Sequence, residues 1–186
     1  MVLQSLLLSL ALLAPGQSEV SEQQLTTLLN QKGQIERQVQ MKGLFDARLQ
    51  LTEGEVELGR QQPGMARVTG RGTATITMGN KPPVDARLFV TLDGKPRYEA
   101  QNHALYLDEA RVVEYRMEPK EAQQQYGIMV NLLLQSLQQR LQGQPVYRLD
   151  GKDARTRWWR DNLNGIEVLP GKLKLTLKET VGKERG

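Results

Sequence analysis

The longest amphipathic pattern in the chain lies between residues 119 and 142. Its central stretch, 122–139, carries no charged residue, although 25% of the whole chain is charged. Apolar residues recur there at three- and four-residue steps, which is the spacing of one face of an α-helix. The members of this stripe are Ala122, Tyr126, Met129, Val130, Leu133, Leu134, Leu137 and Leu141. Ile128 and Leu132 lie at another angle, so we expect the helix to be covered on more than one side, by protein or by an apolar ligand.

Alternation of apolar and polar residues predicts a β-rich block before this helix. The alternating apolar positions are Phe45, Ala47, Leu49 and Leu51, then Val56 and Leu58, then Ala66, Val68, Ala74, Ile76 and Met78, then Val84, Ala86, Leu88, Val90 and Leu92. Gly70 and Gly72 continue the inner face of the third group and are typical of a bend. The Asp-Gly pair at 93–94 predicts a turn. The inward parity of the next strand shifts between Leu105 and Val113, which predicts a bulge.

Start and stop signals frame the remaining elements. Ser21 and Gln24 form the pattern of a helix capping box, and Pro119 and Gly143 suit the two ends of the long helix. The elements predicted after the long helix are a strand at 146–149, a short basic helix at 153–162 and a hairpin at 166–177.

These elements predict a fold of the α+β class. The strands are joined by short connections with no intervening helix, so we expect them to be antiparallel. One sheet face is apolar and the other is charged, and an apolar face is buried against helices in a layered α+β domain. We therefore predict one domain over residues 17–180, in which a strongly curved antiparallel sheet wraps around the long helix. Residues 181–186 are expected to be a frayed tail.

The first residues predict export. The stretch 2–14 is apolar apart from Gln4, Ser5 and Ser9, and it is too short to span a bilayer comfortably. It matches the apolar core of a secretory signal, and small residues stand before Gln17 where a cleavage site needs them. We interpret residues 1–16 as a signal peptide and expect a periplasmic or cell-envelope protein. The alternative is a buried N-terminal helix of the mature fold.

Composition excludes several kinds of chemistry. The chain has no cysteine, which excludes disulfides, thiolate catalysis and cysteine-based zinc sites. The net charge of +4 arises from basic residues mixed with acidic ones, a pattern typical of solvated faces, and we expect no nucleic-acid binding. The densest basic group consists of Lys152, Arg155, Arg157 and Arg160 around Trp158 and Trp159. We interpret the two tryptophans as core anchors, with a membrane contact through Arg157, Trp158, Trp159 and Arg160 as the alternative.

No pattern indicates catalysis. His103 is the only histidine and has no serine or carboxylate motif beside it. Asp108 and Glu109 are neighbours on a predicted strand, so their side chains are expected to point to opposite faces rather than to form a catalytic dyad. Phosphate-binding, dinucleotide-binding and metal-binding spacings are absent from the sequence. We expect no enzymatic activity, no cofactor and no metal.

Several segments, in their order along the chain, closely resemble the YceB-like family of bacterial envelope lipoproteins, a family of unknown function. These segments are VSEQQL at 20–25, ALYLDEARVVEYRMEP at 104–119, the long helix after it, QPVYRL at 144–149 and GIEVLPGKLKLTL at 165–177. The resemblance implies a fold similar to tubular lipid-binding domains, with an apolar groove able to hold an acyl chain. Family members carry a lipid-attachment cysteine at the end of the signal, whereas this region reads LLAPGQSEV here.

We therefore predict a hydrophobic groove between the long helix and the sheet that binds a lipid or another apolar small molecule. The predicted lining residues are Tyr126, Met129, Val130, Leu133, Leu134 and Leu137 from the helix, and Ile76, Leu88, Val90 and Val112 from the sheet. The alternative is a structural or adaptor protein of the envelope, with a closed core and a protein partner.

Overall fold

The computed structural model describes residues 14–31 and 35–179 of the chain. The elements, in chain order, are β1 (Glu19–Ser21), α2 (Glu22–Gln31), β2 (Ile35–Met41), β3 (Phe45–Leu58), β4 (Ala66–Met78), β5 (Val84–Glu99), β6 (Ala104–Glu118), α3 (Lys120–Leu141), β7 (Tyr147–Arg148), α4 (Ala154–Asn162), β8 (Leu163–Leu169) and β9 (Lys172–Leu177). Most of the predicted signal peptide and the predicted tail lie outside the described residues.

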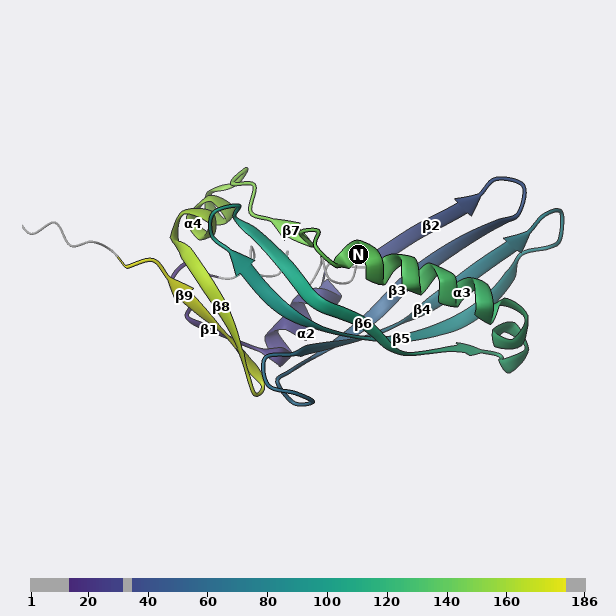
Figure 1. The fold of residues 1–186 in the computed structure, drawn as a ribbon, viewed down its shortest axis with the longest axis horizontal. Coiled ribbons are helices and arrows are strands. Elements are labelled where there is room, and N and C mark those ends of the chain that lie inside the picture. Colours follow the sequence, from purple (N-terminus) through teal and green to yellow (C-terminus); the bar gives the residue numbers. More distant parts are fainter. Residues whose placement is uncertain (1–13, 32–34, 180–186) are drawn as a thin grey trace, which may run out of the picture.

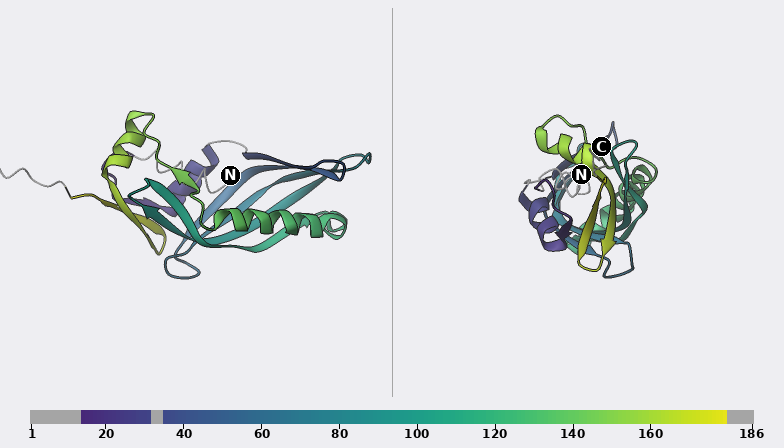
Figure 2. Two further views of the ribbon diagram at one scale, coloured as in Figure 1. Left: turned by 45° about the horizontal axis from the view of Figure 1, so that its top comes forward. Right: turned by 90° about the vertical axis from the view of Figure 1, so that its left-hand side faces the viewer.

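The strands form two antiparallel sheets. The larger one has six strands in the order β2-β3-β4-β5-β6-β7, and the smaller one has the order β1-β9-β8. The large sheet is long and curls into a half-barrel (Figures 1 and 2). Helix α3 runs beside one half of it, while α2, α4 and the small sheet lie towards the other half (Figure 1). The antiparallel, mostly β architecture with a few helices agrees with the α+β prediction, and the wrapping of the sheet around α3 stays a prediction.

The alternation that the sequence predicts is present in β3 and β4. In β3 the buried positions pass from Ala47 to Val56 and Leu58, and a register shift between Leu51 and Glu53 accounts for the change of parity. A single extra residue on one strand reverses which side chains face the core. The break between the alternating groups that end at Leu51 and begin at Val56 is therefore a bulge inside one long strand.

The turn predicted at 93–94 is wrong. Strand β5 runs through Asp93 and Gly94 to Glu99, and the chain turns only at residues 100–103. Asp93 stays in the sheet because Arg67 on the neighbouring strand β4 donates hydrogen bonds of 2.7 and 2.9 Å to its carboxylate. Gly94 occupies a place where a Cβ would lie 2.3 Å from Cγ of Leu107. The Asp-Gly pair therefore serves close packing between strands rather than a turn.

Strand β6 contains two irregularities. Its register against β5 shifts around Gly94 and again between Leu92 and Thr91. The predicted bulge is thus confirmed, but the second shift leaves Val113 45% exposed, whereas it was expected to face inward. Strand β2 was not predicted at all.

The core consists of two apolar clusters on one face of the large sheet. The first joins the sheet to α2, α4 and β8–β9, with Trp159, Leu105 and Val20 fully buried in it. The second lies between the other half of the sheet and α3. The predicted capping box at the start of α2 is confirmed by reciprocal hydrogen bonds between Ser21 and Gln24. Among the described residues, no helix combines the length and apolarity needed to cross a bilayer.

Candidate apolar ligand site between α3 and the half-barrel

The helix α3 meets the sheet through one stripe of side chains. Ala122, Tyr126, Val130 and Leu134 follow one another at four-residue steps, and each is at most 5% exposed. Four-residue steps keep side chains on one face of a helix. On the sheet, these residues contact a patch from four strands, made of Ala47, Ala74, Ile76, Ala86, Leu88 and Met117. We call these ten residues the helix–sheet cluster.

The structure brings the predicted groove residues together. Tyr126, Val130, Leu134, Ile76 and Leu88 belong to the helix–sheet cluster, and Met129, Val90 and Val112 are partly buried against it. The side chains of Leu133 and Leu137 lie outside the part of the chain that the structure describes. The five cluster members have almost no surface open to solvent, so in this conformation their contacts are to protein. A ligand would reach them only if α3 moved away from the sheet.

A second set of apolar side chains surrounds the cluster and is only partly buried. It consists of Phe45, Leu49, Val84, Val90, Val112, Tyr115 and Met129, and we call it the apolar rim. The far side of α3 is open as well, because Ile128 is 83% and Leu132 is 61% exposed. The expectation that the helix is covered on more than one side is therefore not met by the described part of this chain.

Uncharged side chains of α3 bind the free edge of β6. Strand β7 pairs only with Ala104 and Leu105, so no strand within the described residues lies beside the rest of that edge. The Oε1 atoms of Gln123 and Gln138 accept hydrogen bonds of 3.0 Å from the N–H groups of Met117 and Val112. Unpaired backbone groups on a sheet edge need such partners. The glutamines of the charge-free stretch thus have a structural role that apolar periodicity did not reveal.

Helix α2 covers the other sheet edge in the same way. Strand β2 pairs with β3 only as far as Leu51, and beyond it the backbone of β3 is bound by α2. Thr26 Oγ1 accepts from Val56 N–H at 2.9 Å, and the Asn30 amide makes two 2.8 Å bonds to the backbone of Gly54. Four helix residues rise about 6 Å and two strand residues about 6.7 Å, so side chains in four-residue steps match alternate strand residues.

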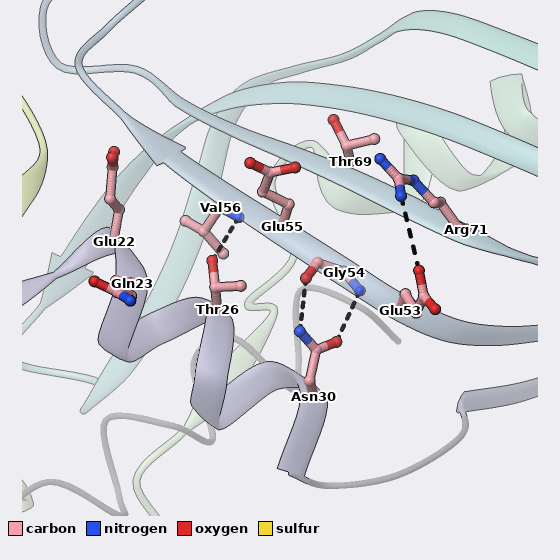
Figure 3. A pocket seen from close by; sticks show the side chains of 10 residues that line it. All are labelled: Glu22, Gln23, Thr26, Asn30, Glu53, Gly54, Glu55, Val56, Thr69 and Arg71. Atoms are coloured by element: carbon pink, nitrogen blue, oxygen red, sulfur yellow. Dashed lines mark hydrogen bonds and ion pairs between the residues drawn. The ribbon is translucent and has the colours of Figure 1, made fainter.

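A polar pocket of about 480 Å³ lies next to this contact (Figure 3). It is lined by Glu22, Gln23, Thr26, Asn30, Glu53, Gly54, Glu55, Val56, Thr69 and Arg71. Arg71 reaches towards Glu53 at 3.8 Å across the strands (Figure 3). The first-turn carboxylate of Glu22 pairs with Arg60, and this hydrogen bonding lowers the pKa of Glu22. The polar lining does not suit an acyl chain.

The predicted membrane contact lies at the opposite end of the molecule from the helix–sheet cluster, on α4. Trp159 is completely buried in the first core cluster, so it is a core residue that does not reach a membrane surface. Trp158 is half-buried and packs edge-to-face on Trp159, with ring centroids 4.9 Å apart. Arg157 is exposed, and Arg160 pairs with Asp161 at 3.1 Å.

The other polar residues considered do not converge on one site. Asp108 accepts a 2.6 Å hydrogen bond from Arg97, whereas Glu109 is exposed. The side chain of His103 has a buried Nδ1 without a hydrogen-bond partner among the described residues. Within residues 14–31 and 35–179, no group of three or more metal-ligating side chains could hold a metal ion.

Comparison with known proteins assigns the chain to a family. A family described as "Protein of unknown function (DUF1439)" matches residues 20–172, which is most of the chain. The protein belongs to this DUF1439 family. The matched residues run from β1 to the start of β9, so the family covers both sheets and the helix–sheet cluster.

Individual proteins similar to the chain carry the name of the family that the sequence resembles. The chain is 27% identical over 160 residues to the "Uncharacterized lipoprotein YceB" of Salmonella typhimurium, covering 84% of each chain. It is 26% identical over 161 residues to the protein of the same name from Escherichia coli K12, again covering 84% of each. The predicted membership of a YceB-like family is confirmed.

Proposed function

We propose that this protein is an exported component of the bacterial cell envelope that binds an apolar ligand, such as a fatty acyl chain, between α3 and the half-barrel. The observation that carries the proposal is the apolar rim around the helix–sheet cluster. A helix beside a curved antiparallel sheet is also what the similarity to tubular lipid-binding domains leads us to expect. Export is supported by the apolar start of the chain and by relatives that are named lipoproteins.

The energy available from such a ligand is substantial. Each buried methylene contributes about 0.8 kcal/mol, so ten carbons contribute roughly 8 kcal/mol before the entropic costs of binding. Deeper insertion requires α3 to separate from the edge of β6. The hydrogen bonds that Gln123 and Gln138 accept from Met117 and Val112 oppose this separation, and each such bond contributes about 0.5–1.5 kcal/mol. Opening the contact would also expose Val130 and Leu134, and each fully buried side chain of this kind contributes about 1.5–3 kcal/mol. We therefore expect the ligand to lie on the apolar rim while α3 stays against the sheet.

Displacement of a fluorescent fatty acid from the purified protein tests the proposal. Met129→Gln places a polar amide on the apolar rim and is expected to weaken binding about tenfold, which corresponds to about 1.4 kcal/mol. Ile128→Gln is the matched control, because Ile128 directly precedes Met129 on α3 but is 83% exposed. Equal effects of the two substitutions, or no fatty-acid binding and no co-purified lipid in native mass spectrometry, would contradict the proposal.

Export is tested separately by fractionation of cells that express the full chain. We expect the protein in the envelope fraction, with the intact mass of a chain that begins at Gln17. A cytosolic protein of full mass would contradict the predicted signal peptide.

A closed structural or adaptor protein is the second candidate, and one observation favours it. Tyr126, Val130 and Leu134 are each at most 5% exposed, so no ligand contacts them in this conformation. This function predicts that fatty acids leave amide hydrogen exchange in α3 unchanged. It also predicts that the protein captures a stable protein partner from the envelope. Ligand binding by the apolar rim instead predicts slower exchange in α3.

A further inference from the structure

Two hairpin loops lie side by side at the end of the half-barrel farthest from α4 (Figure 1). The first is the β2–β3 loop, residues 42–44, and the second is the β4–β5 loop, residues 79–83. The N–H of Gly79 donates a 3.2 Å hydrogen bond to the carbonyl of Leu44, and Phe45 pairs with Met78 across the strands. We call residues 42–44 together with 78–83 the double-hairpin tip.

The double-hairpin tip presents apolar and basic side chains to solvent. Leu44 is 62% and Met78 is 37% exposed, and both are among the large hydrophobic residues that the described chain leaves in water. Lys42 and Lys81 are exposed at the same place, and neither forms an ion pair with a described residue. Exposed apolar side chains flanked by lysine are the composition of surfaces that enter a membrane interface.

The backbone of the tip also suits removal from water. The N–H groups of Gly79 and Lys81 are already bonded within the tip, the latter to the carbonyl of Met78 at 3.0 Å. Pro82 and Pro83 have no N–H to leave unsatisfied. Unpaired donors are costly in a membrane interface, so this loop carries fewer of them than its length would suggest.

We infer that the double-hairpin tip docks on an anionic lipid surface, with Leu44 and Met78 inserted at the boundary between headgroups and acyl chains. The two unpaired lysines complement the charge of anionic headgroups. The nearest acidic residues along the chain, Asp46 and Asp85, are hydrogen-bonded to Gln38 and Thr75 on neighbouring strands.

Docking of the tip on a lipid surface is a separate property from the binding of an apolar ligand, and it does not require that ligand. The double-hairpin tip is nevertheless continuous with the apolar rim, because Phe45 and Val84 directly follow the two loops and both belong to that rim. A docked tip would place the rim next to the lipid. The four residues on α4 that the sequence suggested as a membrane contact lie at the other end of the molecule (Figures 1 and 2).

The first test uses the absence of cysteine from the chain, which allows a single fluorescent label. Leu44→Cys carries an environment-sensitive nitrobenzoxadiazole dye, and Val113→Cys, which replaces an exposed apolar residue on β6, is the control. With vesicles of phosphatidylcholine and phosphatidylglycerol, we expect a blue shift at position 44, quenched by spin-labelled lipids, and none at position 113. An unchanged spectrum at 44, or the same change at both positions, overturns the inference.

The second test measures vesicle co-sedimentation. Lys42→Gln with Lys81→Gln is expected to weaken binding to the anionic vesicles by at least about tenfold at low salt, since each lysine near an anionic surface contributes a factor of about five. Leu44→Gln with Met78→Gln is expected to weaken it similarly, but with less dependence on salt. The pair Lys95→Gln with Lys174→Gln removes the same charge from β5 and β9 and is the control.

Displacement of the fluorescent fatty acid from the same tip variants separates this inference from the proposed function. Tip variants that lose vesicle binding but still bind the fluorescent fatty acid support the docking surface and show that they are folded. If the tip variants sediment with anionic vesicles to the same extent as the unchanged protein, the docking surface is refuted. The tip would then suit a protein partner. If Met129→Gln loses fatty-acid binding but still docks on vesicles, the loss concerns the apolar rim and not the docking surface.

Discussion

The substitution Asp93→Asn tests how the three central strands are joined. Asp93 lies on β5, its side chain is 3% exposed, and it receives hydrogen bonds from Arg67 on β4 and, at 3.4 Å, from Arg111 on β6. This link stands beside the register shifts of β5 and β6, where the half-barrel bends. Asparagine keeps the size of the side chain but removes the charge and turns an N–H₂ group towards a guanidinium donor.

We expect Asp93→Asn to lower the free energy of unfolding by about 3 kcal/mol at neutral pH. Removal of one member of a buried ion pair costs about 3–5 kcal/mol because its partner remains without a counter-charge. The lower end applies because Arg67 is 24% exposed, so water solvates part of its charge. The contact to Arg111, whose side chain is 59% exposed, adds at most about 1 kcal/mol.

The effect should depend on pH in a defined direction. Hydrogen bonds from Arg67 lower the pKa of Asp93, outweighing the burial that would raise it. A carboxylate whose pKa is lowered in the folded state stabilises the protein fully at pH values above its unfolded-state pKa, which is about 3.9 for aspartate. This stabilisation is lost as the pH falls through the folded-state pKa. The difference between Asp93→Asn and the unchanged protein should therefore be largest near neutral pH and shrink in acid.

Urea unfolding followed by circular dichroism at about pH 7 and about pH 3 measures both quantities. Asp108→Asn is the control, because the side chain of Asp108 is 35% exposed and pairs with Arg97, and such pairs contribute about 0–1 kcal/mol. A loss below about 0.5 kcal/mol for Asp93→Asn, or an equal loss at both pH values, would refute the reasoning.

Three further changes test the packing that holds the two sheet edges and the core. Asn30→Ala removes both hydrogen bonds to Gly54 and should lower the free energy of unfolding by about 1–3 kcal/mol in urea. Asn30→Asp keeps the acceptor but turns a second oxygen towards the Gly54 carbonyl, so it should also lose stability, and unchanged stability of both variants would contradict this contact. Gly94→Ala places a Cβ against Leu107 and should lower the free energy of unfolding by about 1–3 kcal/mol. In the double variant with Leu107→Ala the total loss should be smaller than the sum of the two single losses; a total equal to that sum would contradict the clash. Trp159→Ala, at a fully buried position, should lower stability by about 3–5 kcal/mol in the same assay, and a loss under about 1 kcal/mol would contradict its place in the core.

Much of the local structure could be predicted from the sequence. Alternation located β3, β4 and the first part of β5, and the capping-box pattern of Ser21 and Gln24 located the start of α2. The predicted span 119–142 for the long helix agrees with the observed Lys120–Leu141. These features depend on residues within one turn or one strand, where spacing alone decides which side chains share a face.

The candidate site was predicted only as a set of residues. Periodicity placed Tyr126, Val130 and Leu134 on one face of the helix, and the structure buries this face against a patch from β3, β4, β5 and β6. Periodicity also separated Met129, on the stripe, from Ile128, at another angle, and the structure leaves Ile128 83% exposed. It gave no means of deciding how deeply each residue of the stripe would be buried: Met129 is only partly buried, whereas Val130 is 2% exposed.

The sequence by itself determined most of the elements, with β2 as an exception, the apolar face of the long helix and of the alternating strands, and the family to which the chain belongs. The tertiary structure decided that the Asp-Gly pair at 93–94 remains in a strand, that Trp159 is core, and that the glutamines of α3 bind a sheet edge. Two of these outcomes involve partners more than 10 residues away along the chain, Arg67 for Asp93 and Val112 for Gln138. Local propensity describes a residue with its neighbours in the chain, whereas burial and hydrogen-bond partners are set by the packing of distant segments.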